Sequence, residues 1–597
     1  MKKMLFYIAL FAGAMTIGSC SQDEMLTAIE EKPDVTQPLT SFVSGDPETT
    51  RTTTHYKSGS FPFYWTIGDH IWVYKNDATD AGSTGYNKFN HSHSGSTFSE
   101  HESEVGSAGG WAKGHFSVSG VFNGNSYNVY YVGQASPSIP EGTSTDNYAI
   151  NGPLQVTVKN KQMQLTAYNA DHFATSGDCG YAEATKVTNG YKFKMNHMAS
   201  YLMIYPWHDI KYTDNTPAHL ILDKITIEEV SDGGPYAIAG THEITNGQKV
   251  LQPPVADSKK YAITLECGPE KQGFVIPYNE IDYTKNGCFV VMSPSRDNDA
   301  VKTRKLKMTF DYYDVFHRHF SFPYTMNEPK TFYGNTFRRF YPKITGSNID
   351  ITPEFPRSSY YCWDGEYPHT GQLSGNSWNN TKWSDSELVE AQYSCKNAPN
   401  VNELYWYWKN GDIRWDNTTQ YKCWTQNWDS KEYKWVDIQV TITGGVWIKR
   451  RDAILRDGAN NSWSADRYCG HPSHGDAKIA FCLEHGYQNE DMRYWEPEVG
   501  NHGQFSAPNG YTSLGKPGND IIDDYFFLPA LGHIHGSFKV DGLGTEGRYW
   551  LRSICNPHGN THSTNAWYLQ FNSSSFYLTS QTGERGNGYV AGDGWFH

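Results

Sequence analysis

The residues of this chain that could do chemistry are scattered, and their spacing fits no standard catalytic motif. Two pairs of carboxylates stand out: Asp523 is next to Asp524, and Glu484 is close to Glu490. Adjacent carboxylates on a strand point to opposite faces, so they cannot flank one glycosidic bond. The nucleophile-elbow, phosphate-loop and dinucleotide-binding signatures are missing from the sequence. We therefore predict no catalytic residue and no enzymatic activity, with a secreted hydrolase as the least favoured alternative.

One segment gathers soft metal ligands. Its cysteine and histidine residues are Cys469, His471, His474, Cys482 and His485. These residue types can hold zinc, but their spacing fits no standard zinc motif, and an oxidising compartment favours disulfides. Calcium needs converging oxygen ligands, for which Trp415-Asp416-Asn417 and Glu496-Pro497-Glu498 are candidate fragments. Neither matches the usual sugar-binding motifs, so we predict no metal and no cofactor.

Three aromatic residues are candidate ligand-binding residues: Trp463, Tyr494 and Trp495. Asn, Asp and Gly surround them in the sequence, which is typical of surface loops. Exposed rings there could stack on a sugar or contact a protein on a host or bacterial surface. The alternative is a structural role, which we expect for Trp447, Trp550 and Trp567.

The first twenty residues predict export and lipidation. Two lysines follow Met1, an apolar stretch covers residues 4–17, and Gly18-Ser19-Cys20 closes the segment. This order is typical of a secretory signal, and a cysteine directly after small residues indicates a lipoprotein. We predict a signal peptide over 1–19 and acylation of Cys20, for example with palmitate. An ordinary signal with an incidental cysteine is the alternative, and the apolar stretch is shorter than the roughly 20 residues of a spanning helix.

Composition agrees with a place outside the cytoplasm. The acidic run Ser21-Gln22-Asp23-Glu24 is similar to the export signal of surface lipoproteins in certain Gram-negative anaerobes, so we expect an outer-membrane tether. The 597 residues include 15% aromatic and 19% charged residues, as in extracellular β-rich domains. A formal net charge of −14 argues against nucleic acid as a partner.

The pattern of apolar residues divides the chain. Residues 21–50 are polar, which predicts a flexible leader. From Thr52 to about Ile344, short apolar runs alternate with turn residues, which indicates antiparallel β-sandwiches. The predicted strands include His70–Tyr74, Tyr127–Val132, Ala199–Tyr205, Leu220–Ile227 and Lys305–Phe310. Fifteen of the nineteen tryptophans follow Pro353, so the last part differs in kind.

The last part carries signals for both helices and strands. Capping-box patterns predict helix starts at Ser384–Glu387 and at Asn400–Glu403. Strands are predicted at Gln439–Ile442 and Val446–Lys449, with a turn at Gly444-Gly445 between them. A late hairpin is predicted to pair Ala566–Asn572 with Phe576–Ser580. We expect an α+β domain here, and several of the cysteines to be free, buried thiols.

Three segments resemble the fimbrillin family, the type V pilins. They are Trp65–Tyr74 preceded by Arg51-Thr52-Thr53-Thr54, then Phe193–Ile204, and then Thr331–Phe337. The first fits the family pattern W-x-x-G-D-x-I, the second its strand element around a histidine, and the third lies where the family closes its second sandwich. The resemblance covers about residues 45–345, although Gln248–Tyr283 does not align.

A physical interpretation accompanies this resemblance. Gly68-Asp69 suits a turn that leads into the strand after it, and Trp65 is expected to cover the end of the sandwich. We interpret His197 as a buried histidine with its hydrogen bonds satisfied rather than as a catalytic group. These residues predict a scaffold, not a reaction.

The resemblance implies assembly by strand donation. A lipidated precursor is trimmed by a trypsin-like protease after a basic residue, the first strand is lost, and a strand of a neighbouring pilin subunit fills the groove. Arg51 is the best candidate for trimming because it ends the leader, and Lys32 is second. The alternative is an untrimmed chain that keeps its lipid.

The last domain resembles the C-terminal part of some fimbrillin-like lipoproteins and, more distantly, the C-type-lectin-like fold. The matching segments are Cys395–Asn400, Val401–Lys409, Gly411–Trp415, Gly444–Lys449, Tyr525–Gly532, Gly547–Ser553 and Ala566–Leu569 with Arg585-Gly586. A fused domain of this kind suits the tip of a pilus, where a subunit accepts a strand but need not donate one.

These expectations define one architecture. The chain is predicted to be mainly β, with two tandem antiparallel β-sandwich (transthyretin-like) pilin domains followed by an α+β lectin-like domain. The predicted boundaries are a signal peptide at 1–19, a lipidated leader at 20–51, sandwiches at 52–188 and 189–347, and the lectin-like domain at 355–597. The expected function is a non-enzymatic fimbrial subunit, a tip adhesin first at the cell surface and then in the fimbrium. The alternative is a monomeric surface lipoprotein that binds glycans.

Overall fold

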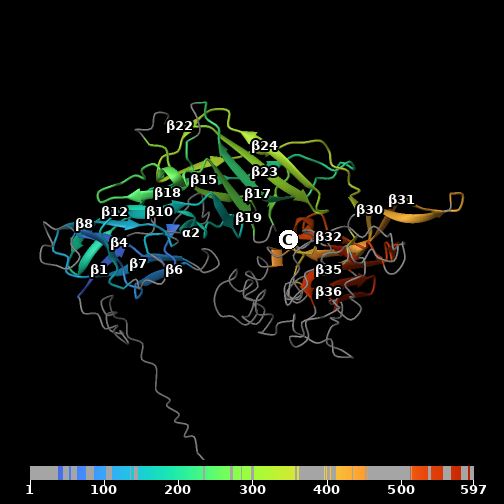
Figure 1. Cartoon of the computed structure of the whole chain (residues 1–597), viewed down its shortest axis with the longest axis horizontal. Helices are drawn as coiled ribbons and strands as arrows, with labels where there is room; N and C mark the ends of the chain where they lie inside the picture. The colour runs from blue at the N-terminus through green and yellow to red at the C-terminus, as the bar shows by residue number, and fades with distance from the viewer. Residues whose placement is uncertain are drawn as a thin grey trace, which may run out of the picture. The chain divides into compact units, whose positions relative to one another are not determined.

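The computed structural model describes the chain in segments, from a first strand near residue 40 to a last strand near residue 590. The described residues are 38–44, 53–54, 63–75, 87–102, 110–134, 136–139, 146–232, 236–268, 273–283, 286–296, 302–355, 360–361, 395–396, 398–399, 404, 412–432, 434–450, 453–454, 511–512, 514–534, 540–554, 566–579 and 589–591. They are mainly β, as the sequence predicts (Figure 1). No described helix is long and apolar enough to cross a membrane.

The first sheet has ten strands and follows the order β6-β7-β1-β13-β12-β8-β4-β5-β9, with β14 on β12. Their bounds are β1 Leu39–Ser44, β4 Trp72–Lys75, β5 Lys88–His91, β6 Thr97–Glu102, β7 Gly110–Ser119, β8 Ser126–Tyr131, β9 Ala149–Ile150, β12 Gly180–Val187, β13 Gly190–Phe193 and β14 Asn196–His197. A separate short ribbon pairs β2 (Thr53–Thr54) with β3 (Phe63–Tyr64). Two predicted strands, at His70–Tyr74 and Tyr127–Val132, correspond closely to β4 and β8.

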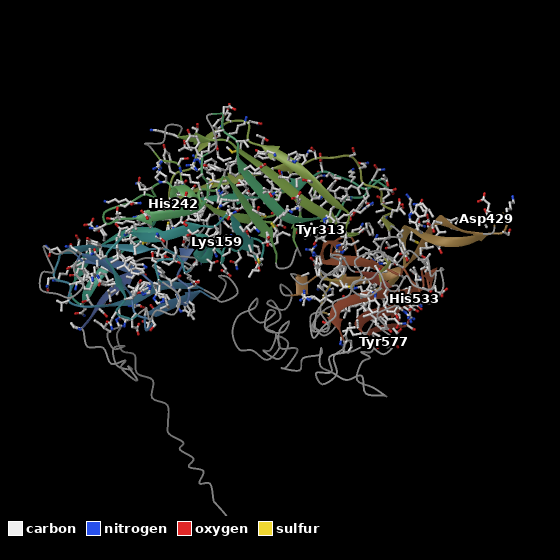
Figure 2. The ribbon with its side chains drawn as sticks, viewed as in Figure 1. Lys159, His242, Tyr313, Asp429, His533 and Tyr577 are labelled. Atoms are coloured by element: carbon white, nitrogen blue, oxygen red, sulfur yellow. The ribbon has the colours of Figure 1, made fainter. Side chains whose placement is uncertain are left out.

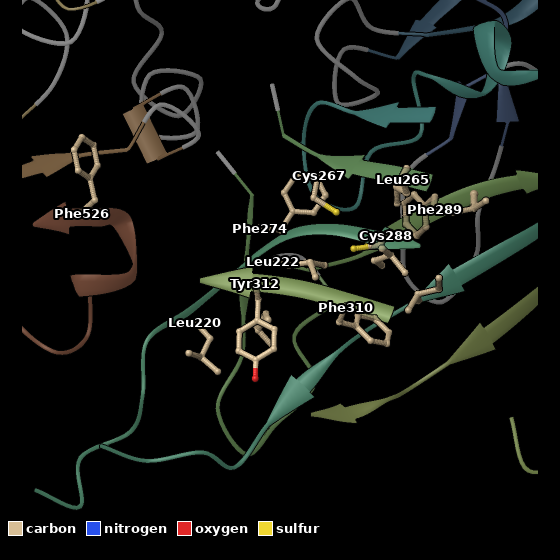
Figure 3. Close-up of a cluster of buried hydrophobic side chains, with 14 of the residues drawn as sticks. Leu220, Leu222, Leu265, Cys267, Phe274, Cys288, Phe289, Phe310, Tyr312 and Phe526 are labelled. Atoms are coloured by element: carbon tan, nitrogen blue, oxygen red, sulfur yellow. The ribbon is translucent and has the colours of Figure 1, made fainter. Parts of the chain in front are cut away.

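The next group of strands contributes many residues to the largest cluster of buried hydrophobic side chains. A six-stranded sheet has the order β11-β19-β17-β23-β24 with β20 on β17, and a three-stranded sheet has the order β21-β15-β26. Their bounds are β11 Lys161–Gln164, β15 Ser200–Ile204, β17 Leu220–Glu229, β19 Ala262–Cys267, β20 Phe274–Ile276, β21 Cys288–Met292, β23 Leu306–Asp314, β24 His319–Thr325 and β26 Thr336–Phe340. Figure 3 shows aliphatic and aromatic side chains from these strands packed together, among them Leu220, Leu265 and Phe310.

Short pairs complete this region. They are β10 (Leu154–Val158) with β18 (Gly240–Ile244), β16 (Trp207–His208) with β27 (Lys343–Ile344), and β22 (Thr303–Arg304) with β25 (Lys330–Thr331). Helical structure between residues 52 and 347 is limited, among the described residues, to α2 (Phe173–Ser176) and η1 (Ala256–Ser258). The predicted strands at Ala199–Tyr205, Leu220–Ile227 and Lys305–Phe310 are confirmed as β15, β17 and β23.

The last part contains two larger sheets. One has the order β28-β30-β31-β32 and the other β29-β38-β35-β36-β37, and β33 pairs with β34. Their bounds are β28 Glu354–Phe355, β29 Tyr360–Tyr361, β30 Ile413–Asp429, β31 Lys434–Lys449, β32 Tyr525–Pro529, β33 His533–Ile534, β34 Val540–Asp541, β35 Glu546–Ile554, β36 Ala566–Asn572, β37 Ser575–Thr579 and β38 Tyr589–Ala591. The predicted late hairpin is confirmed as β36–β37. The predicted helix starts at 384–387 and 400–403 lie outside the described residues.

The predicted turn at Gly444-Gly445 is wrong. β31 runs through both glycines, and the hairpin instead reverses after Asp429, which Figure 2 shows at the end of β30. The two glycines lie where the register with β30 shifts, opposite the stretch between Asp416 and Gln420. Gly444 has a φ of +114°, and a Cβ on it would approach Gly544 O to 2.1 Å. The glycine pair therefore marks a β-bulge and a close approach of two backbones, not a chain reversal.

Candidate functional site

The candidate site is the position of β1 within the first sheet. β1 lies between β7 and β13, antiparallel to the first and parallel to the second. Phe42 stands opposite Phe116 on β7 and opposite Tyr191 on β13. β1 therefore bridges two strands that do not pair with each other among the described residues.

The leader predicted to be flexible over residues 20–51 thus contains a strand at Leu39–Ser44. Its residues alternate in burial, with Phe42 and Ser44 buried on one face and Val43 half-buried on the other. Six residues carry too weak a periodicity to indicate a strand by themselves. Backbone pairing along both edges holds the segment extended, which the sequence of the segment does not reveal.

Phe42 anchors β1 in the core of the first sheet. Its side chain is fully buried, stacks on Tyr191 with ring centroids 4.9 Å apart, and meets Phe122 edge-on at 5.1 Å. Fully burying a phenylalanine side chain stabilises a fold by about 1.5–3 kcal/mol, and aromatic pairs add to this. We call the space between β7 and β13 that β1 fills the slot. The rings of Phe122 and Tyr191 line the part of it that Phe42 occupies.

Ser44 supplies the polar contact of the same slot. Its Oγ accepts a hydrogen bond from Trp65 Nε1 at 2.9 Å and another from the backbone N–H of Gly114 on β7 at 2.8 Å. Ser44 is 2% exposed and Trp65 is fully buried. The structure therefore corrects the expectation for Trp65: its ring lies within the core with Phe116 and Phe193, and its N–H is directed at β1.

The turn after Trp65 holds that ring in place. Residues 67–68 form a turn, as predicted, and Gly68 has a φ of +93°, which favours glycine. The buried carboxylate of Asp69 accepts hydrogen bonds from Thr66 N at 2.7 Å and from the Tyr131 hydroxyl at 2.9 Å. The W-x-x-G-D motif is thus a rigid corner that fixes Trp65 against the slot.

Glycine at position 190 allows β1 to approach the start of β13. Gly190 has a φ of +136°, and a Cβ on it would lie 2.4 Å from Ser41 O. Any larger residue there would clash with the backbone of β1 and strain its own backbone. The slot is therefore shaped to admit a strand at close range.

His197 lies in the interior, as the sequence predicts, but its hydrogen bonds are not all satisfied, because Nε2 is buried without a partner among the described residues. Its Nδ1 is 2.9 Å from Asp178 Oδ1, and Asp178 also accepts a hydrogen bond from the Tyr201 hydroxyl. Burial raises the pKa of Tyr201, so this hydroxyl stays protonated and keeps donating to Asp178. The three side chains are buried, which suits a structural network rather than contact with a ligand.

Asp416 is built into the last part of the chain rather than free for calcium. Its Oδ1 accepts from Thr418 N at 2.7 Å, and its Oδ2 accepts from Trp447 Nε1 at 2.9 Å. Burial acts to raise the pKa of Asp416, but the hydrogen bonds from Thr418, Thr419 and Trp447 outweigh it and lower that pKa. Trp447, Trp550 and Trp567 are fully buried, which agrees with the structural role predicted for them.

The adjacent carboxylates considered for catalysis are placed differently from the prediction, and the other pair, Glu484 and Glu490, lies outside the described residues. Asp523 and Asp524 lie in the 3₁₀ turn η7 (Ile522–Asp524), not on a strand. Asp523 Oδ1 is 2.7 Å from His219 Nδ1. No group of three or more His, Cys, Asp or Glu side chains suited to a metal ion occurs within the described segments.

Several predicted site residues lie outside the described residues. They are the lipidation site Cys20, the trimming site Arg51, the candidate ligand-binding residues Trp463, Tyr494 and Trp495, and the cysteine–histidine set from Cys469 to His485. Their predicted roles stay predictions. In the sequence Arg51 follows β1, with residues 45–50 between them.

Comparison with known proteins gives structural likeness without a family assignment. No family model matches the chain, and no curated protein matches it. Solved structures that it resembles include a candidate cell adhesion protein from Bacteroides ovatus (11% identity, TM-score 0.28, 53% of this chain and 95% of that one). A fimbrial assembly protein from Parabacteroides distasonis has 12% identity and a TM-score of 0.21 over 52% of this chain and 92% of its own.

A third solved structure spans more of the chain. It is a fimbrial protein from Bacteroides ovatus, with 9% identity and a TM-score of 0.21 over 93% of this chain and 98% of its own. Identities and TM-scores at this level do not place the chain in a family.

Proposed function

We propose that this protein is a non-enzymatic fimbrial subunit that assembles by exchanging β1 for a strand of a neighbouring subunit. Cleavage after Arg51 by a trypsin-like protease would separate β1 from the rest of the chain. The proposal rests chiefly on one observation. β1, which precedes Arg51 in the sequence, fills an internal position of the first sheet.

Strand exchange would be favourable because the loss of β1 leaves the first sheet incomplete. β7 and β13 would each present a row of unpaired backbone groups, and the rings of Phe122 and Tyr191 would lose the side chain of Phe42. Unpaired edges beside an apolar slot bind extended peptides, because a new strand restores both the hydrogen bonds and the burial. A strand of another pilin subunit is the occupant that fibre growth would supply.

A tip position is the finer part of the proposal. The last described strand, β38, lies between β29 and β35 in its own sheet, and Tyr589 and Val590 on it are fully buried. A strand held on both edges is not available as a donor. We therefore infer a subunit that accepts a strand and carries residues 355–597 as a head for a surface glycan or protein, with Trp463, Tyr494 and Trp495 as its candidate contacts.

The remaining partners follow from the sequence. Acylation of Cys20 would hold the precursor at the outer membrane, and trimming would release it to the fimbrium. A monomeric surface lipoprotein that binds glycans is the second candidate. It is favoured by the fact that β1 already completes the sheet in the untrimmed chain, so the precursor needs no partner to be folded.

N-terminal sequencing of material sheared from cells separates these candidates. A start at Thr52 together with subunit ladders that resist detergent supports the fimbrial subunit. The matched control is Arg51→Gln, which should retain acyl-Cys20 and abolish the ladders. Wild-type protein that keeps acyl-Cys20 and never enters a polymer would contradict the proposal and favour the monomer.

A further inference from the structure

The slot of β1 presents both polar and apolar groups that the strand inside it must satisfy. Trp65 Nε1 and Gly114 N both donate to Ser44 Oγ, at 2.9 and 2.8 Å. All three residues are buried. If a strand without this acceptor filled the slot, both donors would stay buried without a partner, which is unfavourable for an N–H group.

The apolar contact of the slot is made two residues before Ser44, on the same face of β1. Phe42 fills the space between Phe122 and Tyr191, and in a strand the side chains at 42 and 44 project to one side. Gly190 brings the incoming backbone close to β13, which fixes where along the slot a strand can sit. An incoming strand therefore has little freedom to shift and satisfy the two donors from another position.

We propose that the strand replacing β1 is selected by a hydroxyl-bearing residue two positions after a large aromatic residue. This deepens the proposed function and rests on it. The strand would lie antiparallel to β7 and parallel to β13, with its aromatic ring at the place of Phe42 and its hydroxyl oxygen at the place of Ser44. A strand with only apolar residues on that face would fill the slot but leave Trp65 Nε1 and Gly114 N without an acceptor.

A second hydroxyl of β1 provides a matched control. Thr40 Oγ1 donates to Gly120 O at 2.8 Å, and Thr40 is half-buried. Replacing Thr40 with valine removes a hydroxyl that donates to one carbonyl in a partly buried contact, and it leaves no N–H group without an acceptor. A comparison of Thr40→Val with Ser44→Ala thus separates the loss of a hydroxyl from the loss of an acceptor for buried donors.

The test uses the full mature chain, cleaved after Arg51 by limited treatment with a trypsin-like protease while folded. Fluorescently labelled peptides of residues 36–47 are then added and compete with the cleaved segment for the slot. One peptide has the wild-type sequence, and the others carry Ser44→Ala, Phe42→Ala or Thr40→Val. Fluorescence anisotropy measures binding. We expect Ser44→Ala to weaken binding by about tenfold or more, Phe42→Ala to do the same or worse, and Thr40→Val to stay within about twofold.

Two results would overturn the inference, and they differ. Equal binding of the Ser44→Ala and wild-type peptides would overturn it while leaving strand exchange intact. Failure of the wild-type peptide to bind would overturn strand exchange at this slot and the inference with it.

Discussion

Trp65 Nε1 and Ser44 Oγ are joined by a 2.9 Å hydrogen bond in the interior of the first sheet. Trp65 begins the W-x-x-G-D corner, and Ser44 ends β1. Trp65, which was expected to cover the end of the sandwich, is therefore part of the slot in which β1 lies. The first group of predictions tests how strongly this slot depends on its contacts.

Truncation of Phe42 should strongly destabilise the intact chain. Phe42→Ala removes a fully buried ring that contacts Phe122 and Tyr191, so the free energy of unfolding should fall by about 3–5 kcal/mol. Urea unfolding followed by tryptophan fluorescence measures this change. The control is Val43→Ala on the other face of β1, where the side chain is half-buried and the loss should be smaller. Equal losses would show that Phe42 does not anchor the strand.

Adding a methyl group at position 190 should loosen β1 without emptying the core. In Gly190→Ala the new Cβ would lie 2.4 Å from Ser41 O, at a φ of +136° that L-residues avoid. We expect faster hydrogen exchange of the β1 amides, measured by mass spectrometry. Gly95→Ala is the matched control, because a Cβ there meets nothing within 4 Å. Unchanged exchange in Gly190→Ala would mean that β1 tolerates a wider slot.

Local patterns predicted the elements of the fold better than the site. The strands at β4, β8, β15, β17 and β23 could be predicted because their apolar runs are bounded by turn residues, and the Gly68-Asp69 turn because its residue types favour one. β1 could not, since its extended state comes from β7 and β13, which are distant in the sequence.

The Gly444-Gly445 pair shows the same limit of prediction from local sequence. Gly444-Gly445 reads as a turn because glycine tolerates unusual backbone angles, yet the structure uses that freedom for a bulge beside Gly544. The role of Ser44 is another case. The sequence around Ser44 gives no sign that Trp65 and Gly114 donate to it, because that contact depends on the packing of three segments.

The described cysteines should resist thiol reagents in the folded protein. They are Cys179, Cys267, Cys288, Cys395 and Cys423, and all five are buried. Cys179, Cys267, Cys288 and Cys423 are free thiols, as the sequence led us to expect for several. Figure 3 shows Cys267 and Cys288 among the side chains of the core. Burial raises the pKa of Cys423 to about 12 and that of Cys267 well above its ordinary value, so little thiolate forms at pH 8.

Alkylation followed by peptide mapping checks this prediction. Peptides containing these five residues should stay unlabelled at pH 8 until denaturant is added. A new thiol at an exposed position, Thr325→Cys on β24, is the reactive control. Rapid labelling of the Cys267 peptide in folded protein would contradict the prediction.

Acidification should destabilise the protein through buried neutral histidines. Burial lowers the pKa of His172, His208 and His242 to about 4, because a charged ring is disfavoured in the interior. Their pKa in the unfolded chain is near 6.5, so between these values the unfolded chain binds more protons. The stability that they contribute is complete above about pH 6.5 and is lost as the pH falls to about 4, on the order of 3 kcal/mol for each fully buried ring.

The substitution His242→Gln isolates one of these rings. His242 is hydrogen-bonded through Nδ1 to Gln252 O at 2.6 Å and through Nε2 to Ser293 Oγ at 2.8 Å, a pairing that the neutral ring fits. Urea unfolding at pH 6.5, 5.5 and 4.5 should give a shallower fall in stability for His242→Gln than for wild type, whatever the change at pH 6.5. Thr325→Ala, which replaces a residue without a titratable group at an exposed position on β24, is the control and should keep the wild-type slope. Parallel slopes for His242→Gln and wild type would show that this histidine does not take up a proton on unfolding.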